Sequence, residues 1–135
     1  MTAVGGSCLC GDVAWTVSGP FELMVHCHCG RCRKAHGAAF ATGLLAAADR
    51  FRLVRGRERI VRYESSAGTV RPFCGRCGSA VSEGEGRRGL VAVPAGPIDD
   101  DPGVRPSAHI FVASKGSWFD ITDDLPQLAE GPGAR

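Results

Sequence analysis

A chain of 135 residues with 44% hydrophobic and 22% charged side chains is long enough for one packed domain and too apolar to remain disordered. Its 19 glycines and 8 prolines exclude a bundle of long helices and favour short strands joined by many turns. The 16 basic and 14 acidic residues leave a net charge of +2, which gives no electrostatic reason to expect a polyanionic partner.

Two features of the sequence bear on where the protein is found. Residues 1–7 contain no basic run followed by an apolar core, so no secretory signal is visible. The apolar residues 44–48 fall far short of the roughly 18 residues that are needed to cross a bilayer. We therefore expect a soluble, cytoplasmic protein.

Extended segments and turns alternate along the first part of the chain. Residues 12–17 alternate between polar and apolar, which predicts a strand with Val13, Trp15 and Val17 on one face. Gly19 and Pro20 end this strand. Residues 22–28 and 40–46 predict two more extended segments, and residues 33–38 between them predict one short turn of helix.

The second part of the chain continues the same pattern. Residues 51–54 and 60–63 flank a Gly-Arg-Glu turn at 56–58 and predict a hairpin. A turn at 65–68 precedes a strand over 69–73, and further strands are predicted at 89–94 and 110–112, separated by a proline-bounded loop at 97–106. The fold class is thus mainly β, with one domain over residues 5–128 and a flexible tail over residues 129–135.

Seven cysteines need an explanation in a chain of this kind. Disulfides are rare in the cytoplasm, and an odd number of thiols cannot pair completely. The cysteines fall into three groups, which are Cys8 and Cys10, then Cys27, Cys29 and Cys32, then Cys74 and Cys77. Residues two apart in an extended chain face the same side, so each C-x-C pair can bind one ion. The C-x-x-C-G spacing at residues 74–78 is typical of zinc ribbons.

Seven thiolates divide naturally into four and three. A structural zinc ion takes four ligands, and a catalytic one takes three plus an exchangeable fourth. We assign Cys8, Cys10, Cys74 and Cys77 to a closed site, and Cys27, Cys29 and Cys32 to an open site. Spacing alone leaves the reverse pairing open, iron fits the same ligands, and His28 could close the second site so that both sites are structural. A thioredoxin-like redox pair is disfavoured by the neighbouring C-x-C motifs.

The order of these motifs resembles that of the glutathione-dependent formaldehyde-activating enzymes, a family that includes centromere-protein-V-like proteins. The matching stretches are residues 6–13 (GSCLCGDV), 27–40 (CHCGRCRKAHGAAF), 71–79 (RPFCGRCGS), 109–120 (HIFVASKGSWFD) and 123–127 (DDLPQ). The resemblance implies a β-tent fold of small stacked antiparallel sheets stapled by zinc. It also implies two zinc ions per chain, a structural one and a catalytic one, divided between the cysteines as above.

The family name describes the joining of glutathione to formaldehyde to give S-hydroxymethylglutathione. The resemblance therefore implies a zinc-dependent carbon–sulfur lyase whose partners are a glutathione-like thiol and a small aldehyde, at Cys27, Cys29 and Cys32. His28 and His36 are the candidate proton donors, because they lie within and directly after the cysteine cluster. Arg33, Lys34 and Lys115 are the candidates for holding the carboxylates of glutathione.

The alternative hypothesis is a non-catalytic, zinc-stapled module that binds nucleic acid or protein. Its support is a basic ribbon along the predicted hairpin, made of Arg50, Arg52, Arg55, Arg57, Arg59 and Arg62. Such a ribbon, with Phe51 and Tyr63 beside it, can follow phosphates and stack on bases. The balanced net charge instead favours a solvated hairpin face with Phe51, Leu53 and Ile60 turned to the core.

Overall fold

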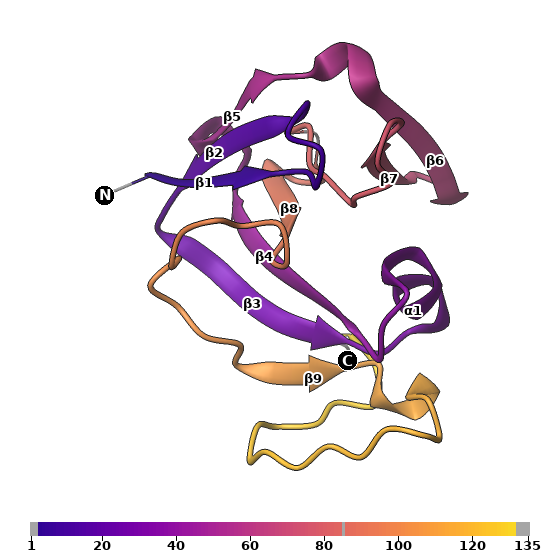
Figure 1. Ribbon diagram of the computed structural model, residues 1–135. Helices are drawn as coiled ribbons and strands as arrows, with labels where there is room; N and C mark the ends of the chain where they lie inside the picture. The colour runs from indigo at the N-terminus through magenta and orange to yellow at the C-terminus, as the bar shows by residue number, and fades with distance from the viewer. Residues whose placement is uncertain (1–2, 85, 132–135) are drawn as a thin grey trace.

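Three small sheets form the architecture in the computed structural model, which describes residues 3–84 and 86–131 (Figure 1). The first sheet has the order β1-β2-β5 and comprises β1 (Ala3–Ser7), β2 (Ala14–Ser18) and β5 (Phe51–Arg55). The second has the order β8-β4-β3-β9 and comprises β8 (Leu90–Pro94), β4 (Ala41–Ala47), β3 (Phe21–Cys27) and β9 (Ala108–Ile110). The third pairs β6 (Ile60–Ser66) with β7 (Thr69–Cys74).

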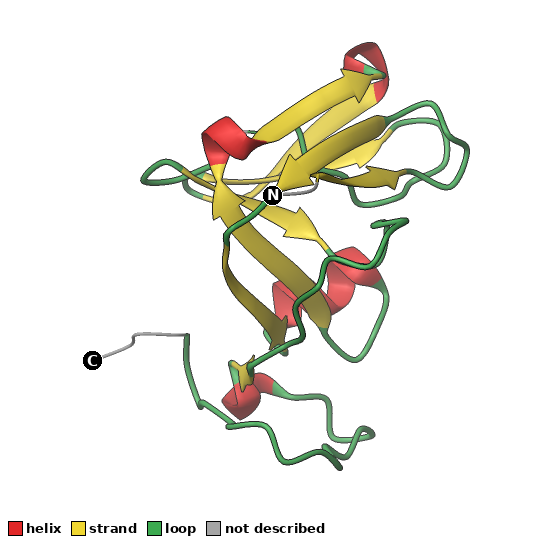
Figure 2. Ribbon diagram, turned by 90° about the vertical axis from the view of Figure 1, so that its left-hand side faces the viewer, coloured by secondary structure: helices red, strands yellow, loops and turns green. Residues whose placement is uncertain are grey.

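Neighbouring strands run antiparallel in all three sheets, except that β9 lies parallel to β3 at the edge of the second sheet. One α-helix, α1 (Gly30–His36), follows β3, and 3-10 turns occupy Ala48–Arg50, Arg57–Arg59 and Val112–Ser114. Figure 2 shows how little of the described chain is helical. The prediction of a mainly β fold of small antiparallel sheets is therefore confirmed. No helix in the described ranges combines the length and hydropathy that a membrane span requires.

The core lies where the first two sheets pack together. Val13, Trp15 and Val17 are at most 1% exposed, as their alternation predicts, and they meet Leu44 and Val93 of the second sheet in one cluster. Burial of side chains of this size contributes about 1.5–3 kcal/mol each. Cys8 and Cys74 belong to the same cluster, so the first cysteine group is built into the edge of the core.

Strand β1 was not predicted, because its sequence is small and rich in glycine. It pairs along its whole length with β2, and Gly6 lies opposite Trp15. A Cβ atom on Gly6 would lie 2.5 Å from the Trp15 ring, so only glycine leaves room for the indole at this position. The bulk of Trp15 therefore explains the glycine at this position in β1. A strand so rich in glycine does not show the alternation of polar and apolar residues from which strands are predicted.

Helix α1 begins three residues earlier than the predicted helical turn. Cys29 caps its N-terminus, since the Cys29 sulfur accepts a hydrogen bond from the Cys32 amide. Gly37 ends the helix with φ +58°, a left-handed conformation typical of C-caps. Cys29 and Cys32 therefore contribute to the start of the helix through this hydrogen bond.

The predicted hairpin of residues 51–54 and 60–63 is wrong. Strand β5 pairs with β2, whereas β6 pairs with β7, from Ile60 opposite Cys74 at one end to Ser66 opposite Thr69 at the other. Between β5 and β6, Gly56 adopts φ +90° so close to the loop before β2 that a Cβ atom would lie 2.2 Å from the Asp12 carbonyl oxygen. This contact and the following 3-10 turn send the chain into a different sheet.

The basic ribbon is divided between two sheets as a result. Arg55 donates to the Gly11 carbonyl, Arg59 pairs with Asp12 at 3.0 Å, and Arg62 pairs with Glu83. Phe51, Leu53 and Ile60 pack against the core, as the solvated-face interpretation expected.

The C-terminal region also differs from its prediction. Strand β9 ends at Ile110, and Phe111 takes a left-handed conformation that leads into a 3-10 turn, so the strand predicted over 110–112 lies two residues earlier. The carbonyls of Leu128, Ala129 and Glu130 accept hydrogen bonds from the amides of residues 111–113. Ordered contacts therefore extend past the expected boundary at residue 128, and the end of the expected tail, residues 132–135, lies outside the described residues.

Candidate metal centres and the adjoining cavities

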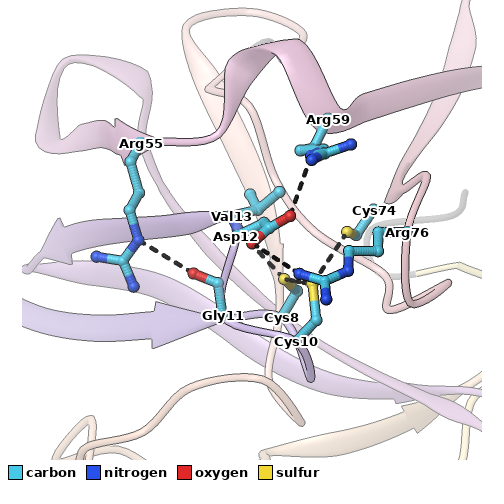
Figure 3. A network of polar contacts seen from close by, with 9 residues as sticks. All are labelled: Cys8, Cys10, Gly11, Asp12, Val13, Arg55, Arg59, Cys74 and Arg76. Carbon is cyan, nitrogen blue, oxygen red and sulfur yellow. Dashed lines mark hydrogen bonds and ion pairs between the residues drawn. The ribbon is translucent and has the colours of Figure 1, made fainter.

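The first cysteine cluster joins two distant parts of the chain. Cys8 and Cys10 lie in the loop after β1, Cys74 is the last residue of β7, and Cys77 follows in the next turn. Their four sulfur atoms all lie within 4.8 Å of one another. The Cys8 and Cys10 sulfurs are 3.6 Å apart, and those of Cys10 and Cys74 are 3.8 Å apart (Figure 3). The structure thus brings together the four cysteines that spacing assigned to the closed site.

Two similar turns aim these sulfurs inward. The Gly11 amide donates to the Cys8 carbonyl at 3.0 Å, and the Gly78 amide donates to the Cys74 carbonyl at 2.8 Å. Both glycines adopt positive φ, +85° and +80°, a conformation that other residues enter at a cost. The Val13 amide also donates to the Cys8 sulfur at 3.2 Å. An amide aimed at a sulfur stabilises the thiolate form, which is the form that binds metals.

Hydrogen bonding gives the thiols of this cluster different pKa values. The hydroxyl and amide of Ser79 lower the pKa of Cys77 to about 5. The Asp12 amide lowers the pKa of Cys10, but burial and hydrogen bonds with the three neighbouring thiols outweigh it and raise that pKa to about 11. Four crowded sulfurs cannot all be ionised alone, because like charges repel; a divalent cation at their centre removes that obstacle.

Charged side chains surround the cluster on its solvent side. Asp12 accepts from Arg59 at 3.0 Å and from Arg76 at 3.4 Å, and Arg55 donates to the Gly11 carbonyl at 3.0 Å (Figure 3). Exposed pairs of this kind contribute little stability individually. Together they tie the loop of residues 8–12 to the segment between β5 and β6, and they place positive charge beside a site that would carry a net −2 with a divalent cation bound.

The second cluster lies where β3 ends and α1 begins. Cys27 is the last residue of β3, Cys29 caps the helix, and Cys32 lies in its first turn. Their sulfurs also lie within 4.8 Å of one another. The hydrogen bond with Cys27 and the nearby Arg71 lower the pKa of Cys32 to about 5, whereas the hydrogen bond with Cys32 and burial raise the pKa of Cys27. Cys32 is thus the more acidic of these two thiols.

Arg71 reaches this cluster from β7 and was not among the predicted site residues. Its Nη2 donates to the Cys32 sulfur at 3.6 Å, and its Nε donates to the Ser65 hydroxyl at 3.0 Å. The available signal was its place three residues before Cys74, at the start of the stretch that resembles the family. Arg71 reaches the cluster only because the third sheet approaches α1 in the folded protein.

A cavity of about 450 Å³ opens beside the three-cysteine cluster. Cys27 and Cys32 lie in its wall, together with His36 of α1, Tyr63 of β6 and Arg71 of β7. The remaining wall is mostly apolar and comes from β4, β7 and β8. His36 is half-buried, and burial lowers the pKa of its imidazole, so the ring is neutral at physiological pH. The cavity therefore combines two sulfurs, a neutral imidazole and a guanidinium.

A second cavity of about 780 Å³ adjoins the first one. The two share Leu45, Val70, Pro72 and Ala92 as walls. The second cavity adds Arg87 and Arg88. Arg87 donates to three neutral groups, which are the carbonyls of Ala67 and Gly68 and the hydroxyl of Thr69. Glu83 also lines this cavity, but its carboxylate is paired with Arg62.

The other predicted site residues lie outside both cavities. His28 is fully buried, and its ring lies within hydrogen-bond distance of His109. Arg33 donates to the His28 carbonyl at 3.4 Å, and Lys34 is exposed on α1. Lys115 donates to the carbonyls of Gly116 and Phe119. Of the non-cysteine candidates, His36 alone is among the residues that line the first cavity.

We predict that the two clusters differ in their contribution to folding. Cys74→Ser should unfold or aggregate the protein, because a structural zinc ion contributes about 10–16 kcal/mol in small domains and a whole domain is stable by only about 5–15 kcal/mol. Cys32→Ser should leave the protein folded, since its cluster closes only a short loop. Thermal unfolding followed by circular dichroism, with metal analysis of each variant, tests this. Equal loss of stability in both variants would contradict the division.

Comparison with known proteins agrees with this geometry. A family model described as "Glutathione-dependent formaldehyde-activating enzyme" matches residues 3–114. Among solved structures, a crystal structure of a protein from Rhodobacter sphaeroides is 29% identical and superposes with a TM-score of 0.58. That match covers 76% of this chain and 91% of the other. The matched region includes both cysteine clusters, and the chain belongs to the family of glutathione-dependent formaldehyde-activating enzymes.

Proposed function

We propose that this protein adds a glutathione-like thiol to formaldehyde at the cluster of Cys27, Cys29 and Cys32, as a zinc-dependent carbon–sulfur lyase working in the synthetic direction. The observation that carries the proposal is the position of this cluster. It has one ligand fewer than a tetrahedral shell needs, and two of its three cysteines lie in the wall of a cavity.

The donor sets fit zinc in both places. Zinc accepts thiolates readily, and the sulfurs form one group of four and one group of three. We therefore propose one zinc ion in each cluster. When bound to Cys27, Cys29 and Cys32, zinc would offer its fourth position to the thiol of the substrate and favour the deprotonated sulfur. We also propose a cytoplasmic location, because seven cysteines in two candidate metal sites suit a reducing compartment.

The reaction requires one proton to be moved and no electrons to be transferred. The thiol loses its proton, its sulfur forms a bond to the carbonyl carbon, the carbon–oxygen π bond breaks, and the proton is returned to the resulting alkoxide. We assign this transfer to His36, because its neutral imidazole lines the cavity and can accept a proton and then donate it. His28 does not line the cavity and has no part in this step.

Arg71 and the second cavity suit the rest of the substrate. Glutathione carries two carboxylates, and guanidinium groups bind carboxylates with paired hydrogen bonds. Arg71 lies next to the Cys32 sulfur, where its charge favours anionic sulfur over the neutral thiol. We propose that the carboxylates farther from the sulfur lie in the second cavity, at Arg87 and Arg88. The alternative of a nucleic-acid module loses its support, since the basic ribbon is divided between two sheets.

The first test follows the substrate sulfur directly. In protein loaded with cobalt, glutathione should change the ligand-field spectrum and strengthen the sulfur-to-metal charge-transfer bands. Cys32→Ser should lose this response. Exchange spectroscopy by NMR then measures adduct formation above its uncatalysed background. A cobalt spectrum that glutathione leaves untouched, together with an exchange rate equal to that of buffer, would refute the proposed function.

A second test separates the proton transfer from binding. We expect His36→Gln to slow adduct formation by about 10²–10⁴-fold, the usual contribution of a positioned acid or base. The same variant should keep the cobalt response to glutathione, because His36 is not a ligand in the proposed site. His28→Gln tests the other histidine and should affect metal binding or stability before it affects the reaction. A full catalytic rate in His36→Gln would remove that residue from the reaction.

A third test examines the second cavity. Changing Arg87 and Arg88 together to Gln should weaken glutathione binding by about 10–100-fold, since hydrogen bonds to charged groups contribute about 1.5–3 kcal/mol. Binding of 2-mercaptoethanol, which has no carboxylate, should not change. Arg105→Gln is the matched control, because Arg105 is exposed and lines neither cavity. Equal weakening for both thiols, or none, would place the carboxylates elsewhere.

A further inference from the structure

A chain of three side chains lies beside the three-cysteine cluster and has no part in the proposed reaction. Asp123 oxygens lie 3.0 and 3.2 Å from Nε2 of His109. Nδ1 of His109 lies 2.8 Å from Nε2 of His28, the residue between Cys27 and Cys29. His28 and His109 are 0% and 1% exposed, whereas Asp123 reaches the surface. These three side chains therefore connect a surface carboxylate to the central residue of the C-x-C motif.

The carboxylate fixes the direction of the hydrogen bonds. A bond from His109 and the Leu125 amide lower the pKa of Asp123, so it is ionised and accepts. In the neutral tautomer that donates from Nε2 to this carboxylate, His109 accepts at Nδ1, and His28 then donates from Nε2. Nδ1 of His28 is left buried without a partner. Asp123 and His109 thus favour one tautomer and one orientation of His28, and this arrangement leaves Nδ1 of His28 unpaired.

The backbone of His28 is held as firmly as its ring. Its amide donates to the Ile110 carbonyl at 3.0 Å, and its carbonyl accepts from Arg33. The ring packs between Phe40 and Phe119, with centroid separations of 5.1 and 6.2 Å. Side chains of adjacent residues in an extended segment point to opposite sides. A backbone rotation at His28 that moves its ring therefore also moves the two neighbouring sulfurs.

We propose that Asp123 is a positioning residue for the three-cysteine cluster. Through His109 it fixes His28, and through His28 it sets the directions of the Cys27 and Cys29 sulfurs before a metal arrives. This inference rests on the proposed metal centre but not on its substrate. Groups that orient ligands from outside the first shell typically change metal affinity by 10–100-fold when they are removed. We expect the loss of Asp123 to act on the three-cysteine cluster and to spare the four-cysteine cluster.

The test uses cadmium alone, without glutathione, on the full chain. Cadmium NMR distinguishes sites with three and four sulfur ligands, so each cluster is followed by its own resonance during chelator competition. Asp123→Ala should lower the cadmium affinity of the three-cysteine cluster by about 10–100-fold and leave the other resonance unchanged. Asp123→Asn keeps an oxygen that can accept from His109 and should restore most of the affinity. Asp124→Ala is the matched control, because Asp124 is the adjacent exposed acid.

A second variant tests the same proposal if Asp123→Ala folds poorly. His109→Phe keeps a ring of similar size and removes both hydrogen bonds, so it should produce the same selective loss. Equal affinities in all variants, or equal weakening of both clusters, would overturn the proposal. A single cadmium resonance in the unaltered protein would overturn the metal centre and this inference with it. Failure of the thiol reaction in metal-loaded protein would refute only the proposed function, since these measurements contain no substrate.

Discussion

The convergence of four sulfurs from residues 8–10 and 74–77 is the constraint on which the remaining architecture depends. It joins the loop after β1 to the end of β7, across a sequence separation of 64 between Cys10 and Cys74. An isolated two-stranded hairpin is marginal in water, and the β6–β7 pair has Val61, Tyr63 and Val70 exposed. Its fixed point is Cys74, which is fully buried in the core. The position of the hairpin, and of the cavity wall that it forms, follows from that anchor.

The two clusters differ in ways that match different tasks. The four-cysteine cluster is surrounded by backbone amides, and two of its members lie within the core. The three-cysteine cluster lies between a strand end and a helix start, where Cys27 and Cys32 face a cavity that also contains Arg71 and a neutral imidazole. Placing the ligands on β3 and α1 keeps them rigid, while the cavity leaves one side of the cluster accessible. The cluster proposed to stabilise the fold and the cluster proposed to react are thus separate in the structure.

Local sequence patterns predicted those features of the structure that depend on local geometry. The spacing of the cysteines predicted their division into four and three, although it left the reverse pairing open, and alternation placed Val13, Trp15 and Val17 in the core. The partner of β6 could not be predicted in this way, because the Gly56 turn resembles a hairpin turn and only its contact with Asp12 redirects the chain. Arg71 and Tyr63 were missed for the same reason: they meet the cluster only when separate sheets approach each other. The orientation of His28 away from the sulfurs follows from alternation, yet proximity in sequence favoured it as a proton donor.

Strand β7 contributes residues both to the first cavity and to the four-cysteine cluster. Arg71 and Phe73 line the first cavity, and Cys74, the next residue, belongs to the closed set of sulfurs. Any coupling between two ligands that bind at the two ends of one segment is reciprocal. The factor by which a metal ion in the closed cluster changes the affinity of the cavity for its thiol equals the factor by which the thiol changes retention of that ion. With the proposed function, such coupling through β7 would make substrate concentration and metal supply interdependent for this protein, although the proposed substrate position does not touch the closed cluster.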